Sequence, residues 1–144
     1  MARALIVGCG CRGQTLGRRL LEEGWAVRGT SRRREGLAAI ESAGLEGALA
    51  DPEQPGTLLE LVADVADVYW LLGSAVGSEE SLEAIHGPRL ERFLERLVET
   101  PVRRFVYEAG GSVDLEVLAQ GRSAVEAASR TWRIPVEIAD RPIV

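Results

Sequence analysis

Short apolar runs alternate along the chain with amphipathic stretches. The apolar runs are typical of strands buried on both faces, and they predict β-strands at residues 4–7, 26–30, 47–50, 65–72, 102–107 and 136–139. Apolar residues at three- and four-residue spacing predict helices at residues 13–23, 35–43, 55–62, 88–98 and 123–132. Small and polar residues at 73–81 predict a loop.

The order of these elements predicts the fold class. Strand and helix alternate through the whole sequence, which indicates an α/β protein with a parallel sheet covered by helices on both faces. Six strands suit the Rossmann-type doubly wound order 3-2-1-4-5-6, in a single domain spanning residues 1–144 without a separate substrate domain. Ligands of such sheets bind beyond the carboxyl ends of the strands, so we expect site residues just after strands 1, 2, 4 and 5.

A Gly-x-Gly-x-x-Gly motif follows the first predicted strand and opens the first predicted helix. Gly8 permits a tight turn, Gly10 lets a pyrophosphate approach the backbone, and Gly13 lets the helix lie close to the sheet. The free N–H groups at the helix start favour negative charge. We therefore expect this loop, with Cys11 and Arg12, to bind the diphosphate of a dinucleotide; a turn that binds nothing is the alternative.

The end of the second predicted strand bears on which dinucleotide binds. It reads Thr30-Ser31-Arg32, and no acidic residue appears before Glu35. An NAD-selective site usually places Asp or Glu here to hold the ribose 2′-OH, whereas hydroxyls and arginine can hold a 2′-phosphate. The sequence thus predicts NADP(H), with NAD(H) as second choice. Arg32 is the first candidate phosphate ligand and Arg12 the second; a solvated helix start is the alternative.

Two further strand ends add candidates for cofactor binding. Asp51 follows the third strand, where it either accepts the adenine amino group or caps a turn. Leu72, Gly73, Ser74 and Ala75 follow the fourth strand and are expected to lie beside the cofactor's ribose and pyrophosphate.

Glu108 and His86 are the candidate acid/base residues. Glu108 follows the fifth strand, where burial could raise its pKa and let it act as a general acid. His86 precedes the helix that begins at Pro88, and it is the one residue whose unperturbed pKa lies near neutrality. The alternatives are a solvated or capping glutamate and a structural histidine.

These residues resemble the NAD(P)-binding half of the extended and atypical short-chain dehydrogenase/reductase superfamily, nearest to NAD-dependent epimerase-like and NmrA-like proteins. The resemblance is carried by residues 7–13, 30–32, 50–51, 104–107 and 136–142. It implies a Rossmann fold and a nicotinamide dinucleotide cofactor. Active members of the superfamily use a Tyr-x-x-x-Lys pair, which this chain lacks, because it has no lysine and because Tyr69 and Tyr107 lie inside predicted strands.

Composition excludes several function classes. Arginine supplies all 17 basic residues against 22 acidic ones, and the net charge of −5 argues against nucleic acid or an anionic membrane as the main partner. No apolar run is long enough to span a membrane, and no secretory signal opens the chain, so we expect a cytoplasmic location. Cys9 and Cys11 lack further metal-ligating neighbours, so no metal site is expected; they fit as small residues, with a redox switch as the alternative.

Three functions remain open from the sequence. The first is a cofactor-binding sensor or regulator with no chemistry of its own. The second is a small NADP(H)-dependent oxidoreductase whose pocket is completed by a partner subunit, and the third is an interaction protein that has lost cofactor binding. Three tryptophans, Trp25, Trp70 and Trp132, allow a homodimer with one of them at the interface, although core burial is preferred for Trp70.

Overall fold

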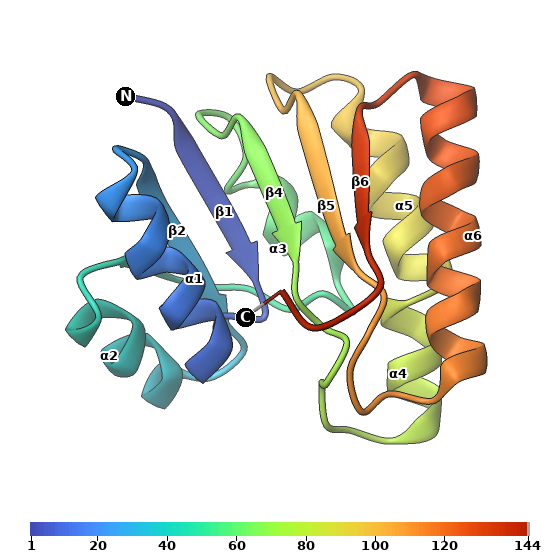
Figure 1. Ribbon diagram of the computed structural model, residues 1–144, viewed down its shortest axis with the longest axis horizontal. Helices are drawn as coiled ribbons and strands as arrows, with labels where there is room; N and C mark the ends of the chain where they lie inside the picture. Colours follow the sequence, from blue (N-terminus) through green and yellow to red (C-terminus); the bar gives the residue numbers. More distant parts are fainter. Residues whose placement is uncertain (144) are drawn as a thin grey trace.

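Six parallel strands form one sheet in the computed structural model, which describes residues 1–143 (Figure 1). The strand order is β3-β2-β1-β4-β5-β6, and every neighbouring pair is parallel. The strands are β1 (Arg3–Val7), β2 (Ala26–Ser31), β3 (Glu46–Leu49), β4 (Asp67–Trp70), β5 (Arg104–Glu108) and β6 (Val136–Ala139). The predicted Rossmann-type doubly wound α/β fold is confirmed.

Helices cover both faces of the sheet (Figure 1). One face packs against α1 (Cys11–Glu22) and α2 (Arg34–Ser42). The other face packs against α3 (Pro55–Leu59), α4 (Glu79–Ile85), α5 (Pro88–Leu97) and α6 (Leu115–Trp132). Successive residues of a strand point to opposite faces, so Ala4 and Ile6 belong to the first core and Leu5 and Val7 to the second.

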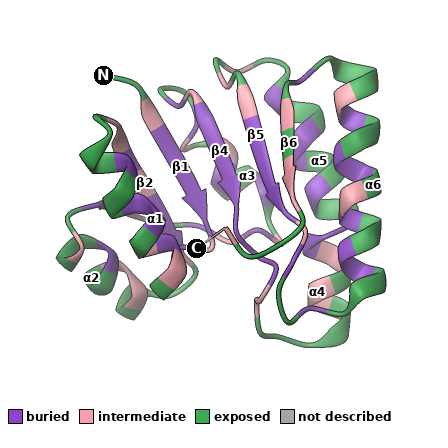
Figure 2. Ribbon diagram, viewed as in Figure 1, coloured by how far each residue is buried: buried purple, intermediate pink, exposed green. Residues whose placement is uncertain are grey.

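The core beneath α5 and α6 is the larger and contains most of the buried aromatic residues. The rings of Trp70, Phe93 and Phe105 pack together, with centroids 5.4 to 6.4 Å apart. The indole N–H of Trp70 donates to the Ile85 carbonyl at 3.2 Å, so the one polar group of this buried ring has a hydrogen-bond partner. The predicted core burial of Trp70 is confirmed, and Figure 2 shows β1, β4 and β5 buried along most of their length.

Several predicted element bounds were wrong. The interval 73–81 is not all loop, because α4 begins at Glu79 after Ser78, whose hydroxyl accepts a hydrogen bond from the Ser81 N–H. Helix α6 begins at Leu115 and not at residue 123, because Asp114 caps it through the Glu116 N–H. Helix α3 ends at Leu59, and β4 is limited to residues 67–70.

In residues 1–143, no helix combines the length and the apolar composition that crossing a bilayer requires.

Candidate nucleotide-binding site

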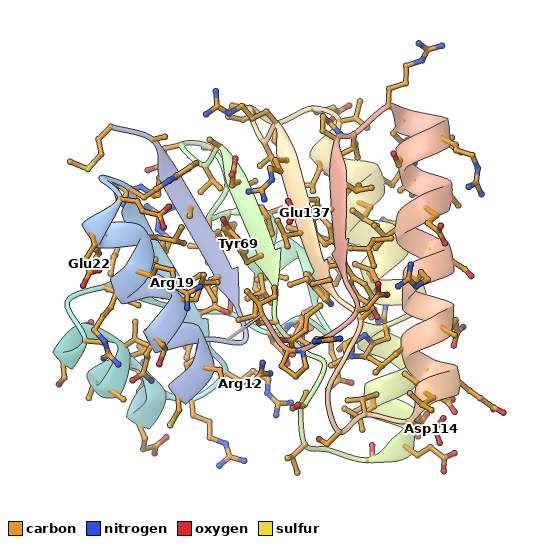
Figure 3. The ribbon with its side chains drawn as sticks, in the orientation of Figure 1. Arg12, Arg19, Glu22, Tyr69, Asp114 and Glu137 are labelled. Carbon is orange, nitrogen blue, oxygen red and sulfur yellow. The ribbon has the colours of Figure 1, made fainter. Side chains whose placement is uncertain are left out.

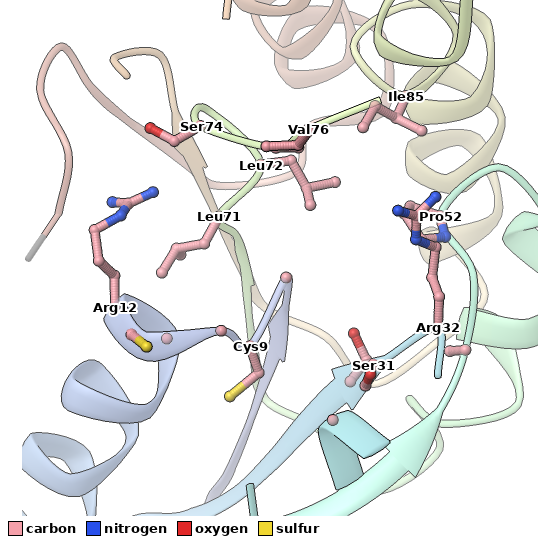
Figure 4. A pocket seen from close by; sticks show the side chains of 18 of the residues that line it. Cys9, Arg12, Ser31, Arg32, Pro52, Leu71, Leu72, Ser74, Val76 and Ile85 are labelled. Carbon is pink, nitrogen blue, oxygen red and sulfur yellow. The ribbon is translucent and has the colours of Figure 1, made fainter. Parts of the chain in front are cut away.

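A pocket of about 490 Å³ lies beyond the carboxyl ends of the strands, at the point where the strand order reverses (Figure 4). Most of the predicted cofactor-binding residues line it: Gly8, Gly10, Cys11, Arg12, Gly13, Thr30, Ser31, Arg32, Leu72 and Ser74. Asp51, Gly73, Glu108 and His86 are not among its lining residues. The structure therefore brings together residues that follow β1, β2 and β4, as expected for the switch point of this fold.

The first glycine of the loop is required by the fold itself. Gly8 has φ +87°, in the left-handed region that side chains rarely adopt. A Cβ at this position would also lie 2.6 Å from the Leu71 carbonyl oxygen, because the backbones after β1 and β4 almost touch here. Gly8 is therefore explained by the turn and its packing alone.

Gly10 differs, because nothing in the fold requires it to be glycine. Its backbone is extended, with φ −82°, a conformation open to any residue. A Cβ at Gly10 would have no heavy atom within 4 Å apart from its own chain neighbours. The position borders open space in front of the N-terminus of α1, and a side chain would occupy that space.

The N-terminus of α1 offers unpaired donors to this space. Gly10 is the N-cap residue of α1, and no side chain caps the helix there. The first N–H groups of a helix have no intrahelical acceptor, and the helix dipole favours negative charge at this end. Together with the space at Gly10, this geometry fits a phosphate or diphosphate group.

The far wall of the pocket contains hydroxyl and guanidinium groups at the end of β2. Thr30 is buried, and the Ser31 hydroxyl donates to the Arg33 carbonyl at 2.8 Å. Arg32 is exposed at the pocket edge, beside Pro52, on the opposite side from Arg12 (Figure 4). Its guanidinium lies 3.8 Å from the Glu53 carboxylate, a loose contact with solvent access that leaves it available to another anion.

Asp51 caps a turn in this structure. Its Oδ1 accepts a hydrogen bond from the Glu53 N–H at 2.9 Å, and its own N–H donates to the Thr57 hydroxyl. This arrangement agrees with the turn-capping alternative, and the carboxylate does not face the pocket.

Sequence reasoning missed several residues of the pocket wall. They are Cys9, Gln14, Gly36, Ala50, Pro52, Glu53, Leu71, Val76, Ser81, Leu82 and Ile85. Those at positions 76–85 lie in the segment before α4 and in α4 itself. The signal that could have found them is the cap of that helix, Ser78 followed by Glu79 and Glu80.

Glu108 is fully buried, and its carboxylate is surrounded by donors. Arg12 donates to both oxygens, at 2.5 and 2.9 Å, in a bidentate ion pair. The N–H groups of Gly73 and Ile143 donate to the same carboxylate, at 3.0 and 3.1 Å. The hydrogen bond from Arg12 to Glu108 raises the pKa of the guanidinium. The arrangement leaves neither oxygen directed toward the pocket.

His86 is also fully buried, and both ring nitrogens are engaged. Nε2 lies 2.9 Å from the Leu72 carbonyl oxygen and therefore donates its proton there, since a carbonyl can only accept. Nδ1 lies 2.6 Å from the Tyr107 hydroxyl and accepts from it. Burial lowers the pKa of His86. These contacts match the structural alternative, a neutral imidazole joining β4, β5 and the end of α4.

The two cysteines have different surroundings. Cys9 is buried beside Gly29, and burial raises the pKa of its thiol to about 12, so the reactive thiolate is disfavoured. Cys11 is exposed at the pocket. Within residues 1–143, no group of three His, Cys, Asp or Glu side chains is placed to hold a metal ion.

Comparison with solved structures identifies the class of fold. A short-chain dehydrogenase/reductase superfamily protein from Agrobacterium tumefaciens with bound NAD aligns with a TM-score of 0.75 at 19% identity, over 94% of this chain and 48% of that protein. UDP-glucuronic acid 4-epimerase from Bacillus cereus in complex with NAD aligns with a TM-score of 0.73 at 15% identity, over 94% of this chain and 54% of that protein. Vestitone reductase from alfalfa aligns with a TM-score of 0.73 at 17% identity, over 96% of this chain and 56% of that protein.

The chain thus has the fold of the short-chain dehydrogenase/reductase and NAD-dependent epimerase proteins, and the predicted resemblance is confirmed at that level. It spans about half the length of these neighbours. The sequence matches no protein-family model and no curated protein.

Proposed function

We propose that this chain binds NADP(H) in the pocket at the start of α1, and that it acts as a cofactor-binding sensor or regulator. The observation that carries the proposal is the open space at Gly10, where neither backbone conformation nor packing asks for glycine. A diphosphate in that space would accept hydrogen bonds from the uncapped N–H groups of α1. Structural neighbours crystallised with NAD support a nicotinamide dinucleotide as the ligand.

The end of β2 supports NADP(H) over NAD(H). Thr30, Ser31 and Arg32 line the pocket there, and none of them carries a negative charge that would repel a 2′-phosphate. Arg32 is exposed and only loosely paired, so it can reach a phosphate without breaking a buried contact. Without a ligand, the Arg32 guanidinium lies beside the Glu53 carboxylate, and this carboxylate would compete with the phosphate for Arg32.

The hydrogen-bond partners of the candidate acid/base side chains support a role in which the protein binds the cofactor but catalyses no reaction. Glu108 is paired with Arg12, and His86 is paired with Tyr107 and the Leu72 carbonyl. The hydroxyl of Tyr107 is buried against Gly121, and Arg122 pairs with Asp140. A bound NADPH would supply a transferable hydride, but these side chains are engaged within the protein and not directed toward the pocket.

The proposal extends to location and assembly. We expect a cytoplasmic protein without nucleic acid among its partners, given the net charge of −5. Trp132 is 43% exposed and is the tryptophan available to a homodimer interface. Sedimentation of the purified chain over a range of concentrations measures that association.

A second candidate function is NADP(H)-dependent oxidoreduction, with the substrate pocket completed by a partner subunit. It is favoured by the observation that a structural neighbour is named a reductase and that the alignment covers only 56% of that protein. Consumption of NADPH with a panel of aldehydes, ketones and quinones, followed by absorbance, separates this function from a sensor.

Titration of the protein with NADPH and with NADH, followed by tryptophan fluorescence, tests the proposal. We expect saturable binding of NADPH and weaker binding of NADH. Binding of neither nucleotide would overturn the proposal, and tighter binding of NADH would overturn the assignment of Arg32.

A further inference from the structure

The pocket covers the half of the site formed by strands 1–3 and, from the other half, only the segment from β4 to α4. A doubly wound sheet consists of two mononucleotide-binding halves, strands 1–3 and strands 4–6, and a dinucleotide lies across both. The pocket is lined by residues that follow β1, β2 and β3 and by the segment from β4 to α4. Within residues 1–143, no lining residue lies beyond Ile85, so β5, β6 and α6 contribute nothing to it.

Arg12 bounds the pocket on the side of β5. Its side chain lies across the pocket from Arg32 (Figure 4), at the edge of the sheet where the strands end (Figure 3). The guanidinium is fixed there by two hydrogen bonds to Glu108 at the end of β5. Because Glu108 is fully buried, moving Arg12 aside would leave a buried carboxylate without its counter-ion, which is strongly unfavourable.

The loops after β4 and β5 are in direct backbone contact behind Arg12. A Cβ at Gly73 would overlap the Gly110 carbonyl oxygen, and a Cβ at Gly111 would overlap the Gly73 carbonyl oxygen. The Val113 N–H donates to that same Gly73 oxygen at 2.9 Å, and the Ser112 N–H donates to the Ser74 hydroxyl at 3.2 Å. The two loops are thus joined by hydrogen bonds and leave no gap between them.

The segment after β6 covers the same place. It runs back from β6 across the carboxyl ends of the strands (Figure 1), and the Ile143 N–H donates to Glu108. A Cβ at Gly110 would lie 2.7 Å from the Cα of Arg141, so this segment rests on the loop after β5. Arg12, the two joined loops and residues 140–143 together form what we call the β4–β5 closure.

We infer that the site recognises the 2′-phospho-ADP-ribose part of its ligand and that the β4–β5 closure leaves the nicotinamide ring unbound. The inference rests on the proposed function, since both use the same diphosphate site. The inference narrows the ligand class to nucleotides that contain a 2′-phospho-ADP-ribose unit, whatever group is attached to the second ribose. A protein built in this way responds to the nucleotide but not to the oxidation state of its nicotinamide ring.

Calorimetric titrations of the wild-type chain with NADP, NADPH and 2′-phospho-ADP-ribose test the inference. We expect dissociation constants within about threefold of one another, because a single added hydrogen bond to nicotinamide would itself be worth roughly tenfold. Nicotinamide mononucleotide alone should give no binding heat. Gly10→Ala should weaken NADP and 2′-phospho-ADP-ribose equally.

Saturation-transfer NMR of bound NADP gives a second readout. The adenine protons should receive magnetisation from the protein, and the nicotinamide protons should receive little. Comparable transfer to both rings, or NADP binding at least about tenfold tighter than 2′-phospho-ADP-ribose, would overturn the inference while leaving the proposed function in place. If neither NADP nor 2′-phospho-ADP-ribose binds, the proposed function fails and the inference fails with it.

Discussion

Two arginines that are adjacent in sequence at the end of β2 have different surroundings. Arg32 lines the pocket, whereas Arg33 is the N-cap residue of α2 and does not line it. We expect Arg32→Ala to weaken NADPH binding about 10- to 100-fold, because a charge-assisted hydrogen bond contributes roughly 1.5–3 kcal/mol. NADH, which has no 2′-phosphate, should bind the variant almost as it binds the wild type. Fluorescence titration measures both.

Arg33→Ala is the matched control, since it removes the same charge from the neighbouring position. It should change NADPH binding far less than Arg32→Ala does. Equal losses in the two variants would show that only general positive charge matters at the end of β2, which would contradict the assigned contact.

His86 makes a pH-dependent contribution to stability. In the folded protein burial lowers the pKa of its imidazole below the ordinary value of 6.5, which the unfolded chain keeps. Below pH 6.5 the unfolded state therefore binds more protons than the folded state, and the free energy of unfolding falls as the pH drops toward the folded-state pKa. Urea denaturation at pH values on both sides of 6.5 measures this slope.

His86→Gln should flatten that part of the pH profile. It should also lower stability at high pH by about 1–3 kcal/mol, since the Tyr107 hydroxyl and the Leu72 carbonyl lose a well-placed partner. A variant with the wild-type pH slope would refute the assignment to His86.

At the scale of single residues, the sequence predicted the glycine loop because its spacing is local. The partners of Glu108 and His86 are not local: Arg12 is 96 positions from Glu108, and Tyr107 is 21 positions from His86. Whether a buried carboxylate acts as an acid or closes an ion pair depends on such distant partners. The sequence alone therefore left both of these roles open.

At the scale of elements, helix α6 packs on β5 through a glycine. A Cβ at Gly121 would overlap the Tyr107 hydroxyl, which is itself bonded to His86. We expect Gly121→Ala to lower the free energy of unfolding by about 1–3 kcal/mol, the usual cost of overpacking a core. Thermal or urea unfolding measures the change.

Gly56→Ala serves as the comparison, because a Cβ at Gly56 in α3 would have no heavy atom within 4 Å beyond its chain neighbours. Alanine is the better helix former, so this variant should be as stable as the wild type or more stable. If Gly121→Ala proves equally harmless, then α6 does not pack on Tyr107 as described.

The prediction of elements depended on their length and their apolar pattern. Helix α5 presents a clear apolar face, and its predicted start at Pro88 is confirmed. Helix α4 has seven residues, of which only Ile85 is buried, so its apolar pattern was too weak to distinguish it from a loop. Helix α6 was predicted too short because Gln120 and Gly121 interrupt the helical pattern, although both lie inside the helix, with Gly121 buried and Gln120 exposed.

At the scale of the whole molecule, the alternation of strands and helices was enough to predict the strand order. It could not show that the two halves of the site differ. That difference arises where the loops after β4 and β5 meet residues 140–143, and each of those contacts joins segments distant in sequence.

In the proposed complex a ligand diphosphate occupies the space beside Gly10, and calorimetric titration of Gly10→Ala with NADPH measures whether it does. Because the added methyl group meets no protein atom, the variant should unfold at nearly the wild-type temperature. We expect Gly10→Ala to bind NADPH at least about tenfold more weakly than the wild type, and Gly56→Ala to bind it as the wild type does. Wild-type affinity in a folded Gly10→Ala protein would mean that no diphosphate occupies the space beside Gly10.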